Sequence, residues 1–265
     1  MPYCRMRDDC SLYFEILGDG PGKPTITFLN GTLQTTVYWK LVSKKLVDHF
    51  RLVIYDARGQ GESDLGSTPL SLQLHVEDLK ALLFELDIPR THLIGISHGA
   101  RVALALAKDA PGLVSRMVLC SLSTRATYRA RMIVRSWYEI LQRHSLDAMV
   151  WAAVPLVFGR NYLKENQKVL ERLVKTIVRR NKTDALRAHI EAIQHYPPLS
   201  SFLHKTAGLV LVITGEDDPL VTLDGAKEVA SLCGGRQVEF QGVGHSIPAE
   251  APNQFTALVL DFLSN

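Results

Sequence analysis

The chain has 265 residues, of which 46% are hydrophobic and 22% charged, and its formal net charge at pH 7 is +3. This length and composition exclude a disordered chain and are typical of one globular domain with a single large core. The sequence contains no repeat, no apolar run long enough to cross a bilayer and no secretory signal in MPYCRMRDDC, so we expect a cytoplasmic protein without a membrane span.

Predicted strands and amphipathic helices alternate along most of the chain. Strand patterns fall at Ser11–Leu17, Thr25–Leu29, Arg51–Tyr55, Thr91–Ile96, Leu113–Cys120, Leu209–Thr214 and Gln237–Phe240. Helical periodicity falls at Tyr38–His49, Ser71–Leu86, Ala100–Ala110, Leu223–Leu232 and Asn253–Leu263. This alternation predicts an α/β fold with a doubly wound, mostly parallel sheet, in which ligands bind beyond the carboxyl ends of the strands.

One interval, residues 123–206, breaks the alternation. It has helical periodicity and no convincing strand, and Pro197-Pro198 closes it before the sheet resumes. We predict a helical cap inserted into a core formed by residues 1–122 and 207–265; a dimerisation surface is the alternative. The stretch from Arg125 to Glu191 has fourteen Lys/Arg and six Asp/Glu, a net charge of +8, so the rest of the chain carries −5.

A candidate nucleophile follows the strand that ends at Ile96. Gly95-Ile96-Ser97-His98-Gly99 has the Gly-x-Ser-x-Gly pattern between a strand and a helix, the context of a nucleophile elbow that exposes the serine hydroxyl. The helix that follows favours negative charge near its N-terminus. Because a serine hydroxyl is a weak nucleophile at neutral pH, Ser97 needs a base that is itself oriented by a carboxylate.

His245 is the predicted base, because GVGHSIPAE places it in a loop after the last predicted strand, at the carboxyl edge. His98 adjoins the serine but projects in a divergent direction from so tight a turn, so lining of the pocket suits it better. The remaining seven histidines fall on helices, at strand starts or in the insertion, where a solvated or packed side chain is the ordinary interpretation: His49, His75, His92, His144, His189, His195 and His204.

The orienting carboxylate is expected in the acidic turn after the strand that ends at Thr214. Glu216, Asp217 and Asp218 follow that strand together, and any of them completes the chain order Ser, Asp, His of this hydrolase arrangement. The loop after Cys120 reads CSLSTR and offers no carboxylate. Acyl transfer also needs donors for the oxyanion. We expect the backbone N–H of His98 and that of Thr32, with Leu33 as the alternative, because Gly31 permits an unusual backbone angle there.

Together these segments resemble the α/β-hydrolase fold superfamily over nearly the whole chain. The matching segments are FLNGTLQTTVYW, VIYDARGQGESD, LIGISHGARVAL, ITGEDDPLVT and GVGHSIPAEAPNQF, in the family's order. The resemblance implies a helical cap after the sixth core strand and places the acid three positions after the strand-end glycine, at Asp218. It also implies a structural role for the turn that supports the oxyanion loop: Asp56, Arg58, Gly59, Gly61 and Ser63.

The chain departs from the family pattern at two positions. Asn30 stands where His is usual, and Ala100 follows Gly99 where a second glycine is frequent. Neither change removes a backbone donor. The candidate pocket lining comprises Asn30, Leu33, Trp151, Phe158 and Ser246, and the aromatic residues of the cap are expected to divide between cap core and pocket wall.

A weaker similarity, in NGTLQTTVYW and the form of the cap, links the chain to hydroxyacyl-carrier acyltransferases of glycolipid-surfactant biosynthesis. A basic cap fits an acidic carrier protein or a coenzyme A thioester as a partner. It does not indicate nucleic acid, because no recognised binding motif accompanies it. The four cysteines (Cys4, Cys10, Cys120, Cys233) lack metal-ligand spacing, and we expect reduced thiols, with Cys4 and Cys10 able to pair only in an oxidising compartment.

Three functions follow from this sequence. The first is a serine esterase that uses Ser97, His245 and Asp218 as a catalytic triad, acts on a small-molecule acyl ester and needs no metal or other cofactor. The second is an acyl thioesterase or acyltransferase that uses carrier-bound or coenzyme A-bound acyl groups. The third is a non-catalytic ligand-binding protein on the same fold, since a fold does not determine a function.

Overall fold

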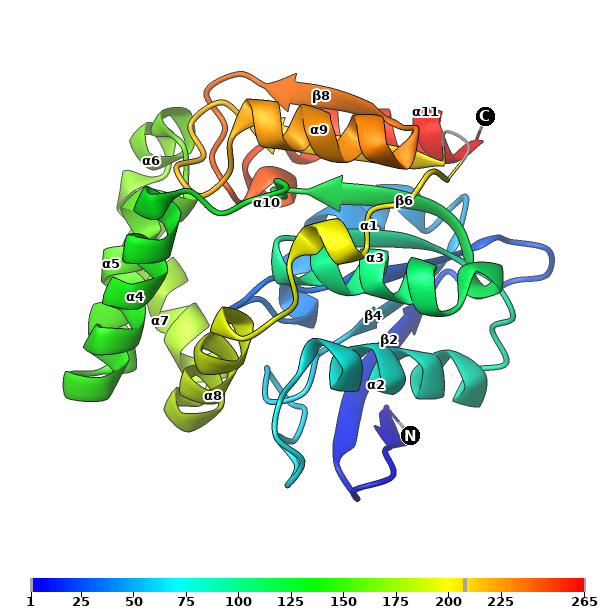
Figure 1. The fold of residues 1–265 in the computed structure, drawn as a ribbon, viewed down its shortest axis with the longest axis horizontal. Coiled ribbons are helices and arrows are strands. Elements are labelled where there is room, and N and C mark those ends of the chain that lie inside the picture. The colour runs from blue at the N-terminus through cyan, green and yellow to red at the C-terminus, as the bar shows by residue number, and fades with distance from the viewer. Residues whose placement is uncertain (1, 207–208, 265) are drawn as a thin grey trace.

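The centre of the protein is an eight-stranded sheet with the order β1-β2-β4-β3-β5-β6-β7-β8 (Figure 1). The structure is a computed structural model that describes residues 2–206 and 209–264. At one edge β2 pairs antiparallel with both β1 and β4, and the five remaining pairs among the described strands are parallel. The strands are β1 (Tyr3–Arg5), β2 (Ser11–Leu17), β3 (Thr25–Leu29), β4 (Arg51–Tyr55), β5 (Thr91–Ile96), β6 (Val114–Cys120), β7 (Val210–Gly215) and β8 (Arg236–Phe240).

Helices cover both faces of this sheet. The central strands β5 and β7 are buried at every position, as expected for strands covered on two sides. One face packs against α2 (Leu72–Glu85), α3 (His98–Asp109) and α9 (Leu223–Cys233), and the other against α1 (Lys40–Leu46) and α11 (Pro252–Ser264). The predicted doubly wound, mostly parallel α/β sheet is therefore confirmed.

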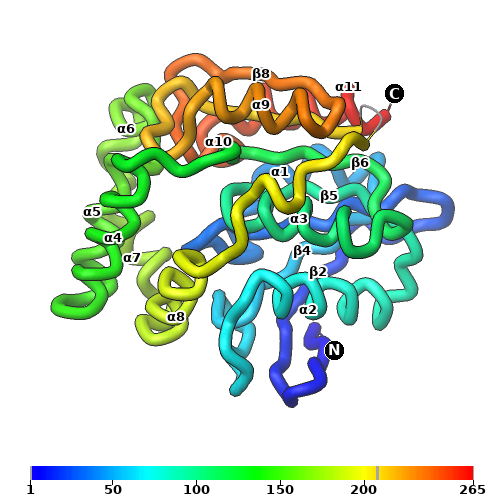
Figure 2. Tube along the Cα trace, in the orientation of Figure 1, coloured from blue at the N-terminus to red at the C-terminus, as the bar shows by residue number. Residues whose placement is uncertain are grey.

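Five helices between β6 and β7 gather at the carboxyl ends of the strands (Figure 2). Their apolar sides form a separate core that includes Trp137, Leu141, Met149 and Val174. Leu33 and Leu220, from loops of the sheet, pack against that core. These helices are α4 (Tyr128–Arg143), α5 (Leu146–Val157), α6 (Arg160–Glu165), α7 (Leu170–Arg180) and α8 (Thr183–Gln194), and we refer to them as the cap.

Short elements complete the fold. They are the 3₁₀ turns η1 (Thr36–Trp39), η2 (Pro111–Leu113), η3 (Gln167–Val169) and η4 (Leu199–Ser201), together with α10 (Ile247–Glu250). The expected boundary between cap and core lies between residues 206 and 207. Residues 207–208 lie outside the described residues. Among the described helices, none combines the length and the apolar character needed to cross a membrane.

The N-terminal strand β1 was not predicted from the sequence. It has only three residues, too few to show the alternation of a strand, and it forms because it pairs with β2. Cys4 lies in it and packs into the core, and Cys10 is buried nearby. All four cysteines are free thiols, as expected.

Candidate active site

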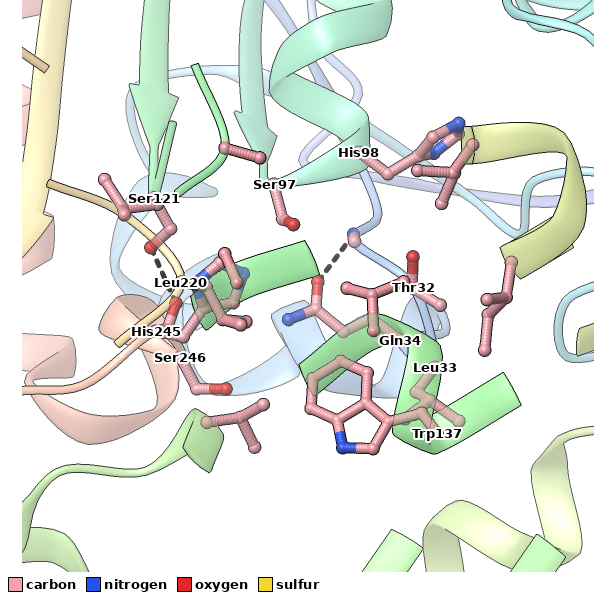
Figure 3. Close-up of a pocket in the computed structure, with 18 of the residues that line it drawn as sticks. Thr32, Leu33, Gln34, Ser97, His98, Ser121, Trp137, Leu220, His245 and Ser246 are labelled. Carbon is pink, nitrogen blue, oxygen red and sulfur yellow. Dashed lines mark hydrogen bonds between the residues drawn. The ribbon is translucent and has the colours of Figure 1, made fainter. Parts of the chain in front are cut away.

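Ser97 occupies a sharp turn between β5 and α3. Its φ is +54° and its ψ is −113°, a conformation that L-residues rarely adopt. Glycine is required on both sides, because a Cβ on Gly95 would lie 2.6 Å from the carbonyl carbon of Gly99, and one on Gly99 would lie 2.2 Å from the Leu29 oxygen. The backbone is held by a 2.9 Å hydrogen bond from the Ser97 N–H to the Cys120 oxygen. The hydroxyl therefore points out of the turn into a cavity (Figure 3).

His245 lies in the loop between β8 and α10, and it contacts Asp218. The imidazole Nδ1 lies 2.7 Å from Asp218 Oδ2. Because a carboxylate only accepts, the proton sits on Nδ1, which leaves the lone pair of Nε2 free. The other carboxylate oxygen, Oδ1, accepts the N–H of Leu220 at 2.8 Å, and the side chain of Asp218 is fully buried. This arrangement fixes both the tautomer and the orientation of the ring.

Ser97 and His245 line the same cavity, whose volume is about 1110 Å³. Within the described residues no hydrogen bond joins the serine hydroxyl to the imidazole. Such contacts are often long before substrate binds and tighten in the reacting complex. The structure thus brings the Asp218–His245 pair and the elbow serine to one site under the cap.

The acidic turn divides between two tasks. Asp218 faces His245, whereas Glu216 and Asp217 both form ion pairs with Arg160 at the start of cap helix α6. Asp217 also accepts the backbone N–H of Arg160 at 2.8 Å. Of the three carboxylates that the sequence left open, only Asp218 contacts the imidazole.

The loop after β3 presents unpaired backbone donors to the cavity. Within the described residues, the N–H groups of Thr32, Leu33 and His98 make no hydrogen bond, and all three residues line the cavity. The N–H of His98 is free because it opens α3. The N–H of Gly31, in contrast, donates to Gln34 Oε1 at 2.8 Å, the dashed line on the right of Figure 3. The arrangement can stabilise a developing oxyanion.

Two supports hold this loop. The side chain of Asn30 donates to the Tyr55 oxygen at 3.0 Å and accepts Trp39 Nε1–H at 2.7 Å, so it braces the loop from within the core and does not line the cavity. The turn after β4 supplies the second support, because Gln60 Nε2 donates to the Gly31 oxygen at 2.9 Å.

Asp56 anchors the same turn after β4. Its carboxylate accepts the N–H groups of Thr36 and Glu62, yet burial raises the pKa of Asp56 to about 6. Arg58, in the same turn, forms a buried bidentate pair with Asp78 of α2. The turn thus ties the loop after β3 to the sheet and to α2.

Only some of the residues predicted to line the pocket do so. Leu33, Phe158 and Ser246 line the cavity. Trp151 does not, since it lies on the outer side of α5 with 41% of its surface exposed. Helix periodicity alone could not separate the two faces of α5, because apolar residues occur on both.

Sequence reasoning missed two residues that position His245. Ser121 Oγ donates to the His245 oxygen at 2.7 Å. Glu250 accepts three backbone N–H groups, those of Gly244 and Ser246 beside the histidine and that of Gly159 in the cap. Burial raises the pKa of Glu250, and these three donors oppose that shift. The only sequence signal was position: Ser121 directly follows β6, and Glu250 closes the short helix after the histidine.

The charge of the lining is one-sided. Among the described residues, no Asp or Glu lines the cavity. Five arginines do so: Arg101, Arg125, Arg131, Arg135 and Arg180. Arg135 pairs with Glu139. Among the described residues, the Arg101 guanidinium donates only to the Pro197 oxygen, at 3.3 Å, and its partial burial lowers its pKa.

Comparisons with known proteins identify the family and the fold of the chain. A family model described as alpha/beta hydrolase fold matches residues 24–252. The chain is 26% identical to a protein named carbamate hydrolase RutD in Agrobacterium fabrum, over 95% of this chain and 98% of that protein. It is 25% identical to a 2-hydroxy-6-oxononadienedioate/2-hydroxy-6-oxononatrienedioate hydrolase of Pseudomonas putida, over 99% of this chain and 96% of the other.

A solved structure gives the same result for the fold. The enol-lactonase from Burkholderia xenovorans LB400 superposes with a TM-score of 0.89 at 26% identity and covers 100% of both chains. These three proteins, to which the chain is similar over nearly its full length, are named as hydrolases or as a lactonase.

Proposed function

Because this chain belongs to the α/β hydrolase fold family, we propose that it is a serine hydrolase that cleaves carboxylic esters through an acyl-enzyme on Ser97. The observation that carries the proposal is the convergence of three loops on one cavity. The elbow brings Ser97, the loop after β8 brings His245 already bonded to Asp218, and the loop after β3 brings a free N–H.

The proposed reaction has two halves. Ser97 Oγ attacks the acyl carbon while Nε2 of His245 takes its proton and then passes it to the leaving alcohol. Water, activated by the same imidazole, then hydrolyses the acyl-enzyme. Asp218 keeps the proton on Nδ1 in both halves and stabilises the imidazolium.

The N–H groups of His98 and Thr32 donate to the oxyanion of each tetrahedral intermediate. Loss of one such donor costs about 3 kcal/mol of barrier in other enzymes. Leu33, whose φ is +70°, offers the alternative second donor. The similarity to an enol-lactonase adds support, because a lactone is a cyclic carboxylic ester.

The test uses Ser97→Ala and a matched control. We expect Ser97→Ala to lower kcat/KM for p-nitrophenyl esters by at least about a thousandfold and to abolish labelling by a fluorophosphonate probe. The control is Ser123→Ala, another serine of the cavity, whose hydroxyl donates to the Arg125 oxygen and which should keep both properties. Full activity in Ser97→Ala would refute the proposal, and an unlabelled wild-type protein would favour the non-catalytic alternative.

The arginines of the cavity favour a second candidate, in which the substrate is anionic. Half-buried Arg101 has a backbone carbonyl but, among the described residues, no carboxylate as a partner, and a charged group in that state is stabilised by an anion. A coenzyme A thioester, a carrier-bound acyl group and an ester with a free carboxylate all share that chemistry. The acyl donor would then be selected by charge as well as by shape.

A comparison of substrates distinguishes the three kinds of anionic acyl donor from a neutral ester. We measure kcat/KM for p-nitrophenyl acetate, for the mono-p-nitrophenyl ester of succinic acid and for acetyl-coenzyme A. If the natural substrate is anionic, kcat/KM should be higher for the charged acyl donors than for the neutral one. Arg101→Gln should then lower this charged-to-neutral ratio of kcat/KM by about tenfold or more. A charged-to-neutral ratio of kcat/KM near one that changes neither with salt nor in Arg101→Gln contradicts this candidate. Such a result leaves the esterase proposal untouched.

A further inference from the structure

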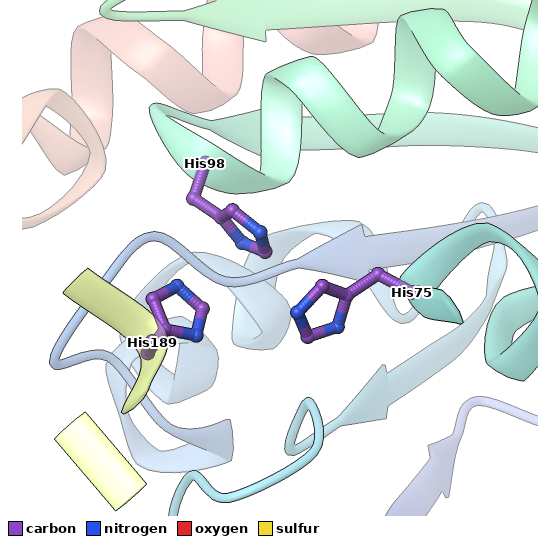
Figure 4. A group of neighbouring side chains, drawn as sticks. All are labelled: His75, His98 and His189. Atoms are coloured by element: carbon purple, nitrogen blue, oxygen red, sulfur yellow. The ribbon is translucent and has the colours of Figure 1, made fainter. Parts of the chain in front are cut away.

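Three histidines from three different helices meet behind the elbow. His75 comes from α2, His98 from α3 and His189 from cap helix α8, and their rings face one another (Figure 4). The ring centroid of His98 lies 4.7 Å from that of His75 and 4.3 Å from that of His189. The centroids of His75 and His189 are 5.6 Å apart. The interplanar angles of 76°, 68° and 56° show that the rings converge without stacking.

Each ring has a nitrogen with no hydrogen-bond partner among the described residues. These atoms are His75 Nε2, His98 Nδ1 and both ring nitrogens of His189, and the backbone of Asn30 also interacts with the His98 ring. All three residues are buried, with 3%, 6% and 2% of their surfaces exposed. Leaving a buried polar atom unpaired is costly, and most proteins avoid it. Three such rings in one place are therefore suited to share one partner.

We propose that His75, His98 and His189 form a binding site for a Zn²⁺-type transition-metal ion, which joins the cap to the core. One ligand atom from each ring can be chosen so that all three lie within 4.8 Å of one another. Around a tetrahedral Zn²⁺ with Zn–N bonds of about 2.0–2.1 Å, ligand nitrogens are about 3.3 Å apart, so small side-chain rotations suffice.

The donor set determines the class of ion. Three imidazoles suit Zn²⁺, Co²⁺, Ni²⁺ or Cu²⁺, whereas Mg²⁺ and Ca²⁺ require oxygen ligands. The nearby carboxylate of Asp78 is not available, because it is paired with Arg58. Burial lowers the pKa of all three histidines, that of His189 to about 4, so the rings are neutral and their lone pairs are free at pH 7.

The surroundings supply orientation and access. Tyr196 Oη lies 3.2 Å from His98 Nε2, a contact that orients the ring and engages Nε2, so that Nδ1 is the ligand atom we propose for this residue. His98 also lines the cavity, which gives an ion a path of entry and leaves a fourth coordination position for water or an anion. Because His189 belongs to the cap, a bound ion would hold α8 against α2 and α3.

The test measures metal binding directly and needs no activity. Wild-type protein is stripped with a chelator and titrated with ZnCl₂, and bound zinc is counted by mass spectrometry after gel filtration. We expect one tightly held ion per chain and a rise in Tm on binding. His75→Gln and His189→Gln should each bind Zn²⁺ at least about tenfold more weakly and lose the rise in Tm. Co²⁺ should give the visible absorption of a low-coordinate imidazole site in the wild type and not in these two cluster variants.

Matched controls are His144→Gln and His195→Gln, both exposed histidines of the cap region, which should bind as the wild type does. Circular dichroism shows whether each variant is folded. A wild-type protein that retains no zinc overturns the proposal, as does equal binding by the wild type and the two cluster variants. Neither result depends on Ser97, so the outcome is separate from that of the proposed esterase activity.

Discussion

Asp218 differs from its two acidic neighbours in the side chain that it contacts. It lies 2.7 Å from the imidazole of His245, whereas Asp217 pairs with Arg160 of the cap. Asn in place of Asp keeps the size of the side chain but removes the charge and offers an amide, which can favour the wrong tautomer of the imidazole. The task of each carboxylate thus follows from contact and not from its place in the turn.

We expect Asp218→Asn to lower kcat for a p-nitrophenyl ester by about a hundredfold to ten-thousandfold, because the imidazole loses its orienting charge. Asp217→Asn is the matched control, with an equal change in charge one residue away, and its kcat should fall by less than about threefold. Steady-state kinetics of the two variants give the comparison. Equal losses in both would mean that the turn acts only as a structural unit.

At the scale of elements, the elbow depends on how closely α3 approaches β3. Gly99, in the first turn of α3, touches the backbone at the end of β3, and its missing Cβ is what permits the contact. The helix cannot move away freely, because its other residues are packed against β5 and β6. Packing of α3 therefore sets the position of both Ser97 and the N–H of His98.

Gly99→Ala should destabilise the fold by about 1–3 kcal/mol or more, because a Cβ 2.2 Å from the Leu29 oxygen forces α3 away from β3. Gly112→Ala, in the exposed turn before β6, is the control, since a Cβ there meets no atom within 4 Å. Urea denaturation of both variants measures the difference. A Gly99→Ala protein as stable as Gly112→Ala would show that the helix has room to shift.

At the scale of the whole molecule, buried histidines set the response to acid. Burial lowers the pKa of His92 to about 4, with smaller effects from Arg116 and Arg90, and it lowers those of His75, His98 and His189 as well. In the unfolded chain each takes up a proton near pH 6.5, so their contribution to stability is complete above that pH and is lost toward pH 4.

Asp56 acts in the opposite direction. Its folded pKa of about 6 lies above the unfolded value of 3.8, so the folded state gains stability as the pH falls between these values. Burial likewise raises the pKa of Asp78 and Glu250, whereas hydrogen bonds lower the pKa of Asp8 and Glu216, which adds to the effect of the four histidines. The balance of these groups therefore favours loss of stability on acidification.

We expect Tm to fall as the pH is lowered from 6.5 to 4.5. For His92 alone, a pKa lowered to about 4 corresponds to about 3 kcal/mol over the full range. Thermal melts of His92→Gln should show a smaller fall than those of the wild type, and the exposed His49→Gln should match the wild type. A His92→Gln melt that tracks the wild type across this range would assign the acid response to other groups.

Much of the fold and part of the candidate site could be predicted from the sequence, because their signals are local. Continuous apolar strands alternating with amphipathic helices predict a doubly wound sheet, and two glycines around Ser97 predict a tight turn after a strand. The carboxyl ends of parallel strands share one edge, so Ser97, His245 and the acidic turn could be placed at the same end without coordinates.

Only the tertiary structure decided which side chains meet there. The choice of Asp218 over Asp217 depends on where Arg160 of the cap lies, and the exposed position of Trp151 depends on which face of α5 packs inward. The cluster of His75, His98 and His189 has no sequence signature, because its members are far apart in the chain and come together only where the cap packs against the core. Local periodicity carries information about elements, whereas contacts between distant elements arise from packing of the whole chain.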